Sequence, residues 1–256
     1  MQQHLEGKVV VVTGAASGMG AAMARLFAAE GATVVAGDVN QERLDGVARE
    51  IEGAGGVVTT VVGDIASREG ANKLIDTATQ NHGRLDVLCN NAGIMDQFQG
   101  VASLDDQTWN RIMAVNLYAP MALSRAAVQW MKEHGGGSIV NSSSAAGVGG
   151  GAAGAAYTAS KHGVIGLTRN TAVTYGPQGI RANAIVIGGV ATNIQETIAA
   201  EKIDQEAMAE YGKWHQLAPD TLDPEDVAQL ALFLASDASK RINGATIAAD
   251  GGWTAF

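Results

Sequence analysis

Short runs of β-branched residues alternate with longer stretches rich in Ala and Leu along this 256-residue chain, and this alternation constrains the fold more than any other feature. The first run, KVVVVT at residues 8–13, is continuously apolar, which is typical of a strand buried on both faces. A helical stretch over residues 20–30 follows it and ends at Gly31. Repeated strand-helix-strand units of this kind predict an α/β fold, a parallel sheet with helices on both faces and right-handed crossovers.

The same pattern predicts the other elements. Strands are expected over residues 33–36, 57–62, 85–89, 138–141, 181–187 and 245–248, and helices over 41–52, 68–81, 105–116, 118–132, 157–175, 193–211 and 224–235. Pro224 in the first turn of the last helix and Asp223 before it are typical of a helix start. No linker or fixed-period repeat divides the sequence, so we expect a single domain over residues 1–256.

Charge and cysteine content narrow the classes of partner. The formal net charge of -9 argues against a nucleic-acid-binding surface, which needs clustered Lys and Arg. The single cysteine, Cys89, permits no intrachain disulfide and no cysteine-based metal cluster, and we expect it to be a small core residue and the protein to hold no metal. The N-terminus has no long apolar region, and apolar stretches are broken before they reach membrane-spanning length. We therefore expect a cytoplasmic protein without a membrane segment.

A glycine-rich segment, TGAASGMG at residues 13–20, joins the first strand to the first helix. Glycines there let the backbone turn tightly and approach a pyrophosphate, which rests on the helix N-terminus. The spacing differs from the G-x-G-x-x-G fingerprint, so a plain glycine turn stays an alternative. Asp38, eighteen residues after Gly20, can accept hydrogen bonds from an adenosine ribose and repel a 2′-phosphate. Because no basic residue adjoins Asp38, NAD(H) is favoured over NADP(H), with a solvated turn aspartate as the alternative.

The residues with the clearest chemistry are Tyr157 and Lys161, in the segment YTASK, with Ser144 thirteen positions before the tyrosine. Positions i and i+4 share a helix face, so the ammonium is expected to lower the pKa of the phenol from about 10 and make it a general acid/base. Ser144, at the end of a strand, can donate to a substrate oxygen. Ser142 and Ser143 adjoin it, but the spacing selects Ser144. The segment NNAG at residues 90–93 would let a ligand approach the backbone, although by itself it is also typical of a simple turn.

Taken together, these segments resemble the classical short-chain dehydrogenase/reductase family over nearly the whole chain. The matching features are TGAASGMG, NNAG, Asn116, Ser144, YTASK and the C-terminal Asp250-Gly-Gly. The resemblance implies a Rossmann-type, doubly wound sheet of seven strands in the order 3-2-1-4-5-6-7. It also implies hydride transfer between NAD(H) and a ketone or secondary alcohol. The cofactor half would span about residues 1–150 and a substrate lid about residues 188–217.

The resemblance also implies roles for single residues. Tyr157 would protonate or deprotonate the substrate oxygen, Lys161 would hold the nicotinamide ribose and tune Tyr157, and Ser144 would orient the carbonyl. Asn116 would hold a water that links Lys161 to solvent. The residues expected to contact the cofactor are Gly14, Ser17, Gly18, Met19, Gly20, Asp38, Val39, Asp64, Ile65, Asn91, Ala92, Gly93, Tyr157, Lys161, Gly188, Val190 and Thr192.

The substrate pocket is expected to be apolar and lined partly by very small residues, which predicts a ketone of moderate bulk, cyclic and steroid-like ketones included. Its expected wall contains Met95, Ala146, Ala153, Ile187, Gly189, Ile194 and Trp214. Ile187 stands where the family usually has proline before a glycine, and we hypothesise that this change reshapes the pocket. Charged anchors are sparse, so an acyl-carrier-protein or coenzyme A substrate is less favoured.

Two other functions and one assembly remain as hypotheses. An epimerase that uses bound NAD, or an NAD-sensing binding protein without turnover, would fit the same fold. The first usually has a longer substrate domain, and the second usually lacks a catalytic residue that is present here. The family resemblance further implies a homotetramer, with pairing through helices 105–134 and 157–175 and with the C-terminal residues 253–256 at a second interface.

Overall fold

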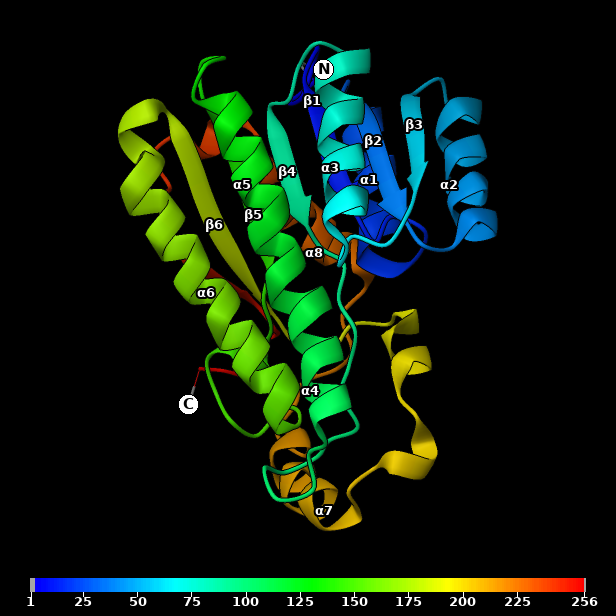
Figure 1. Cartoon of the computed structure of the whole chain (residues 1–256), viewed down its shortest axis with the longest axis vertical. Helices are drawn as coiled ribbons and strands as arrows, with labels where there is room; N and C mark the ends of the chain where they lie inside the picture. The colour runs from blue at the N-terminus through cyan, green and yellow to red at the C-terminus, as the bar shows by residue number, and fades with distance from the viewer. Residues whose placement is uncertain (1–2, 256) are drawn as a thin grey trace.

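A parallel sheet of seven strands lies between two layers of helices in the computed structural model of this chain, which describes residues 3–255 (Figure 1). Its strand order is β3-β2-β1-β4-β5-β6-β7, and every neighbouring pair is parallel. This order confirms the sequence-based prediction. The strands are β1 (Val9–Thr13), β2 (Thr33–Asp38), β3 (Val57–Val62), β4 (Val87–Asn90), β5 (Gly137–Ser142), β6 (Ile180–Ile187) and β7 (Thr246–Ala249).

The helices form two layers and one outlying element. One face of the sheet is covered by α1 (Gly18–Ala29), α2 (Gln41–Gly53) and α8 (Pro224–Ala235), and the other by α3 (Arg68–Asp76), α4 (Asp106–Met113), α5 (Ala119–Met131) and α6 (Ala155–Tyr175) (Figure 1). Helix α7 (Gln205–His215) lies beyond the carboxyl ends of the strands, at the bottom of the view. None of the helices formed by residues 3–255 combines the length and apolarity needed to cross a membrane.

Strand β1 shows why the apolar runs are continuous. Its side chains alternate between the two faces, so Val10 and Val12 pack with α1 and α8, whereas Val9 and Val11 pack with residues of α3 and α5. Both faces are therefore core, and both alternating sets must be apolar. Cys89 in β4 is buried in the first of these clusters, and burial raises the pKa of its thiol to about 12, as expected for a small core residue.

Two sequence-based predictions of helices need correction. Residues 106–131 form one continuous helix instead of two, because a π-helical segment, Ala114–Tyr118, joins α4 to α5 without leaving helical backbone angles. The expected helix over 193–211 is instead two short 3₁₀ turns, Asn193–Thr197 and Ala200–Lys202, followed by α7. Extended residues such as Ile198 and Ile203 separate these pieces, so the lid is segmented.

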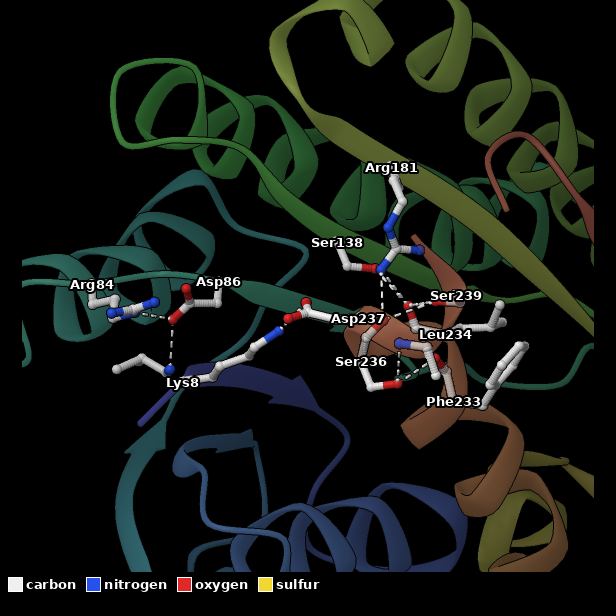
Figure 2. Close-up of polar contacts among 12 residues, drawn as sticks. Lys8, Arg84, Asp86, Ser138, Arg181, Phe233, Leu234, Ser236, Asp237 and Ser239 are labelled. Atoms are coloured by element: carbon white, nitrogen blue, oxygen red, sulfur yellow. Dashed lines mark hydrogen bonds and ion pairs between the residues drawn. The ribbon is translucent and has the colours of Figure 1, made fainter. Parts of the chain in front are cut away.

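A cluster of polar contacts closes the amino-end edge of the sheet (Figure 2). The carbonyl oxygen of Leu234, near the end of α8, accepts hydrogen bonds from the Ser138 and Ser239 hydroxyls at 2.9 and 3.0 Å and from the Arg181 guanidinium at 2.9 Å. Arg181 also donates to the carbonyl oxygen of Ser236 at 3.2 Å. Helix C-terminal carbonyls lack partners within the helix, so these donors stabilise the end of α8 against β5 and β6.

Candidate active site

The glycine loop between β1 and α1 forms a close-packed turn at the carboxyl end of the sheet. A Cβ on Gly20 would lie 2.0 Å from the carbonyl oxygen of Gly14, and Gly18 has a φ of +50°, so side chains are excluded from both places. Ser17, at the N-cap of α1, makes no side-chain capping bond, and the first turn of α1 holds no acidic residue. Backbone amides at this helix start are thus available to an anion, and the loop fits the pyrophosphate of a dinucleotide.

Asp38 ends β2 beside this loop, half-buried. Its carboxylate accepts hydrogen bonds from the backbone N–H of Ala16 at 3.0 Å and of Asn40 at 2.9 Å. Arg43, which sequence reasoning missed, lies in the first turn of α2 and pairs with Glu196 of the lid at 3.1 Å. Glu196 raises the pKa of Arg43 most, and Asp38 adds to this effect. A basic group therefore lies in the field of Asp38, although it is not adjacent in sequence.

The NNAG segment is bonded directly to the strand that leads into the glycine loop. The Thr13 hydroxyl accepts from the backbone N–H groups of Asn91 and Ala92, both at 3.0 Å, and the Asn91 amide donates to the Thr13 carbonyl at 3.0 Å. Gly93 lies next to the catalytic candidates, since a Cβ there would be 3.4 Å from the Lys161 ammonium nitrogen. The two small-residue segments therefore form one continuous floor.

The other expected cofactor residues surround this floor unevenly. Thr192 packs over the glycine loop, because its methyl carbon lies 2.8 Å from where a Cβ of Gly18 would be. Val190 pairs with Leu222 in an isolated bridge, and Gly188 packs against Asp250. The remaining members differ in exposure: Val39 and Asp64 are exposed, Met19 is half-buried, and Ile65 is buried in the core.

Tyr157 and Lys161 lie one helical turn apart at the start of α6, and both side chains are buried. The Lys161 nitrogen is 5.4 Å from the centre of the Tyr157 ring and donates to the Ser142 carbonyl at 2.9 Å. Burial raises the pKa of Tyr157 to about 12, a hydrogen bond with Ser144 lowers it, and the charge of Asp96 raises it. Burial also lowers the pKa of Lys161 to about 8. The expectation that Lys161 brings the pKa of the phenol below 10 is therefore wrong in this structure, because desolvation outweighs the ammonium.

The three adjacent serines have different partners. The Ser143 hydroxyl donates to the Lys161 carbonyl at 3.0 Å, and that of Ser142 donates to the Asn91 side chain at 3.5 Å. Ser144 begins the 3₁₀ turn Ala145–Gly147, and its hydroxyl accepts from the Ala146 amide at 3.2 Å. Among the three, Ser144 is the one whose hydroxyl interacts with Tyr157.

Asn116 lies within the π-helical segment and is almost fully buried. Its carboxamide accepts from the Ile94 N–H and donates to the Ile94 carbonyl, both at 2.9 Å, and it donates to the Ser160 hydroxyl at 3.3 Å. These bonds connect the α4–α5 helix to the segment after NNAG and to α6. The wide turn of the π-helix is what directs the carboxamide at these partners, in line with the frequent occurrence of such turns at functional sites.

Known proteins share both this sequence and this architecture. A family model described as enoyl-(acyl carrier protein) reductase matches residues 14–254. A 3β-hydroxysteroid dehydrogenase of Eggerthella lenta is 40% identical over 253 residues, covering 98% of this chain and 96% of the relative. The cis-4-hydroxycyclohexanecarboxylate dehydrogenase of Sinomonas cyclohexanicum is 42% identical and covers 100% of both chains.

A crystal structure from Beutenbergia cavernae gives the match in three dimensions. It is described as a proposed NAD(P)-dependent gluconate 5-dehydrogenase with NADP bound at low occupancy, and it superposes with a TM-score of 0.87 at 38% identity over 100% of both chains. The chain belongs to the short-chain dehydrogenase/reductase family. Its members matched here are oxidoreductases, which is the class that the Ser144, Tyr157 and Lys161 arrangement serves.

The pocket wall of this short-chain dehydrogenase/reductase differs from the sequence-based prediction. Met95, Ala146 and Ala153 do pack around Tyr157 in one small apolar cluster. Ile187 does not join them, which corrects its expected place. It ends β6 opposite Ala249 and is buried in the core on the α1 and α8 face of the sheet.

The lid residues of the expected pocket are more open. Trp214 is 52% exposed and lies against the backbone of Gly151, where a Cβ would be 2.4 Å from the indole ring. Ile194 is half-buried and Gly189 exposed. The short-chain dehydrogenase/reductase thus has a buried apolar contact region beside its tyrosine and a half-open region under the lid.

Sequence reasoning missed a polar stretch directly after NNAG, Asp96 to Gln99. Asp96, Gln97 and Gln99 are all buried, and the Oε1 atoms of the two glutamines have no hydrogen-bond partner among the described residues. Phe98 between them has a φ of +53°, in the left-handed region that is uncommon for residues other than glycine. Polar residues in the middle of an expected apolar wall were the signal that could have revealed this stretch.

Proposed function

We propose that the protein is an NAD(H)-dependent oxidoreductase that transfers a hydride between nicotinamide and a ketone or secondary alcohol. The observation that carries the proposal is the buried Tyr157 phenol, which interacts with the Ser144 hydroxyl and has Lys161 one turn away. A phenol whose pKa is near 12 is protonated at neutral pH and is therefore ready to act as a general acid toward a carbonyl oxygen. Ser144 would donate to the same oxygen and stabilise its developing charge.

The cofactor would lie across the floor made by the glycine loop and NNAG. Gly14, Gly18 and Gly20 would admit its pyrophosphate, Asp38 its adenosine ribose, and Lys161 its nicotinamide ribose. When bound, the nicotinamide accepts or supplies the hydride. Lys161 would also hold a proton within reach of Tyr157, since its own pKa is lowered to about 8, and Asn116 would bind a water that passes protons outward.

Asp38 favours NAD(H) over NADP(H), because its carboxylate would repel a 2′-phosphate. Two observations weigh on the other side. Arg43 lies in the field of Asp38, and the Beutenbergia cavernae relative holds NADP. We keep NAD(H) because the Arg43 guanidinium is paired with Glu196 and so has a carboxylate partner already.

The substrate that best suits the site is an apolar ketone of moderate bulk, including cyclic ones. Met95, Ala146 and Ala153 give an uncharged contact surface beside Tyr157, and two relatives are named for a hydroxysteroid and a hydroxycyclohexane substrate. Residues 188–217 would serve as the lid over this surface. The segmented turns between Thr192 and Asp204 give the lid places to bend.

The test is the decrease of absorbance of the reduced nicotinamide while a panel of cyclic and open-chain ketones is offered, first with NADH and then with NADPH. We expect faster consumption with NADH, and a decrease in kcat of at least about a hundredfold for Tyr157→Phe, which removes the proton donor. Tyr118→Phe serves as the matched control, because Tyr118 is partly exposed on the α4–α5 helix.

Other outcomes would favour other functions. Binding of NADH without turnover of any ketone or alcohol would favour an NAD-sensing protein, and inversion at a substrate carbon without net oxidation would favour an epimerase. Faster turnover with NADPH would contradict the role given to Asp38. Retained activity in Tyr157→Phe would contradict the role given to the tyrosine.

A further inference from the structure

Helix α6 carries Tyr157 in its first turn, yet it begins without a capping side chain of its own. Gly154 occupies the N-cap and can offer no side-chain acceptor, and the first turn holds no acidic residue. Free N–H groups at a buried helix start need partners, because an unpaired buried donor costs free energy. The required acceptor comes from a distant part of the sequence.

Asp96 supplies it. One carboxylate oxygen accepts from the Gly154 N–H at 3.2 Å and the other from the N–H of Tyr157 itself at 2.9 Å. The first oxygen also accepts from the Phe98 N–H at 3.0 Å. Asp96 is fully buried, and a Cβ on Gly154 would lie 2.6 Å from its carboxylate, so glycine at that position is what allows the approach.

The carboxylate is also fixed from the side of the lid. Asp204, the N-cap of α7, donates its N–H to the Gln97 carbonyl at 3.3 Å and accepts from the Gly100 N–H at 3.4 Å. The Phe98 ring lies 6.4 Å from that of Tyr211 and 6.1 Å from that of His215, both on α7. The loop that contains Asp96 is therefore held between the lid and the start of α6.

We propose that Asp96 is a positioning residue for Tyr157, which fixes the first turn of α6 and places one negative charge beside the phenol. This inference rests on the proposed function, because it assumes that Tyr157 exchanges a proton with the substrate. A carboxylate at a helix N-terminus is stabilised by the helix dipole, so Asp96 stays a charged acceptor although no cation pairs with it among the described residues.

The charged and titratable groups around the pair are few. Lys161 approaches Tyr157 from its own helix, Asp96 from the loop after β4, and Tyr211, His215 and Asp204 belong to the lid. The charge of Asp96 acts in the same direction as burial and holds the pKa of Tyr157 high. Removing that charge should therefore lower the pKa of the phenol, whereas removing the more distant charge of Asp204 should not.

The experiment compares the wild type with Asp96→Asn, Asp96→Glu and Asp204→Asn, and measures kcat, KM and their pH dependence in ketone reduction. Reduction needs the protonated phenol, so its rate falls as pH rises through the pKa of Tyr157. In Asp96→Asn we expect this alkaline fall to move about one unit toward lower pH, with kcat reduced about tenfold to a hundredfold and the Kd for NADH unchanged. Asp96→Glu keeps the charge but displaces it, so we expect lower kcat with the alkaline fall unmoved.

Asp204→Asn is the matched control, and we expect it to leave the alkaline fall in place. Wild-type kcat and pH dependence in Asp96→Asn would overturn the proposal, and so would an equal pH shift in Asp204→Asn. If Asp96→Asn does not fold, Asp96→Glu decides, since wild-type kcat in that variant contradicts a positioning role. A wild-type protein without turnover contradicts the proposed function itself, and the inference about Asp96 falls with it.

Discussion

At the scale of single residues, the glycine loop shows how one missing side chain can matter more than helix propensity. Gly20 lies inside α1, where alanine would normally be the better residue by about 1 kcal/mol. The contact between its Cα and the Gly14 carbonyl reverses this preference, because no methyl group fits there. Gly46 in α2 is the opposite case, with no atom within 4 Å of where its Cβ would be.

For Gly20→Ala we expect the free energy of unfolding to fall by about 1–3 kcal/mol, through overpacking against the loop, and NADH affinity to fall at least about tenfold. Gly46→Ala should raise the free energy of unfolding by about 0.5–1 kcal/mol and leave NADH affinity unchanged. Urea unfolding and NADH fluorescence titration measure the two quantities. Equal stability changes in the two variants would show that the close contact has no energetic weight.

The residues that sequence analysis found and those it missed differ in a physical way. Tyr157, Lys161 and the loop glycines belong to short local patterns, so spacing alone indicated them. Asp96 acts on amides 58 and 61 positions away, and Arg43 on a carboxylate 153 positions away, so only the folded chain brings these partners together. Ile187 failed for a related reason, because the side of the sheet that its side chain faces depends on strand register.

At the scale of elements, strands were predicted more closely than connections. Each expected strand was found within two or three residues of its predicted place, because burial on both faces gives an unbroken apolar run. The α4–α5 helix was predicted as two pieces because a π-helical turn leaves no mark in apolar spacing. The lid was predicted as one helix because its composition suits a helix, whereas its structure depends on contacts such as that of Thr197 with the Met95 amide.

The end of α8 offers a test of how side chains from other strands stabilise a helix. Arg181→Met removes donors from the Leu234 and Ser236 carbonyls while it keeps much of the side-chain volume (Figure 2). We expect the free energy of unfolding to fall by about 1–3 kcal/mol, because buried carbonyls lose a charged donor. Arg49→Met, on the exposed side of α2, is the control and should change it by less than about 0.5 kcal/mol. Similar values for both variants in urea unfolding would argue against a capping role.

At the scale of the whole molecule, exposed apolar residues on the α4–α6 layer support assembly. Trp109 is 38%, Tyr118 41% and Val173 81% exposed, on α4, on the π-helical segment and on α6. Contiguous exposure of such residues is typical of protein–protein contacts. The expected contact of residues 253–256 at a second interface stays a prediction. Phe256 lies outside the described residues, and Trp253 contacts the lid through His215.

We expect light scattering to give a homotetramer at micromolar concentration, and Val173→Glu to yield smaller species because it adds a charge to the proposed contact. Val101→Glu is the matched control, since Val101 is similarly exposed, at 84%, but lies in a turn away from these helices. A monomeric wild type would contradict the expectation. Dissociation by both variants alike would place the contact elsewhere.

The way in which the lid is attached limits how this protein can be recombined with its relatives. Helix α7 and its flanking turns contact the body through the loop that begins at Asp96 and through the glycine-rich stretch around Gly151. A chimaera that receives only a foreign lid would therefore meet a loop shaped for Phe98, Tyr211 and Trp214. Grafts that carry residues 96–103, 148–154 and 193–217 together should keep their proton chemistry while they exchange substrate preference, so these separate stretches form one heritable unit.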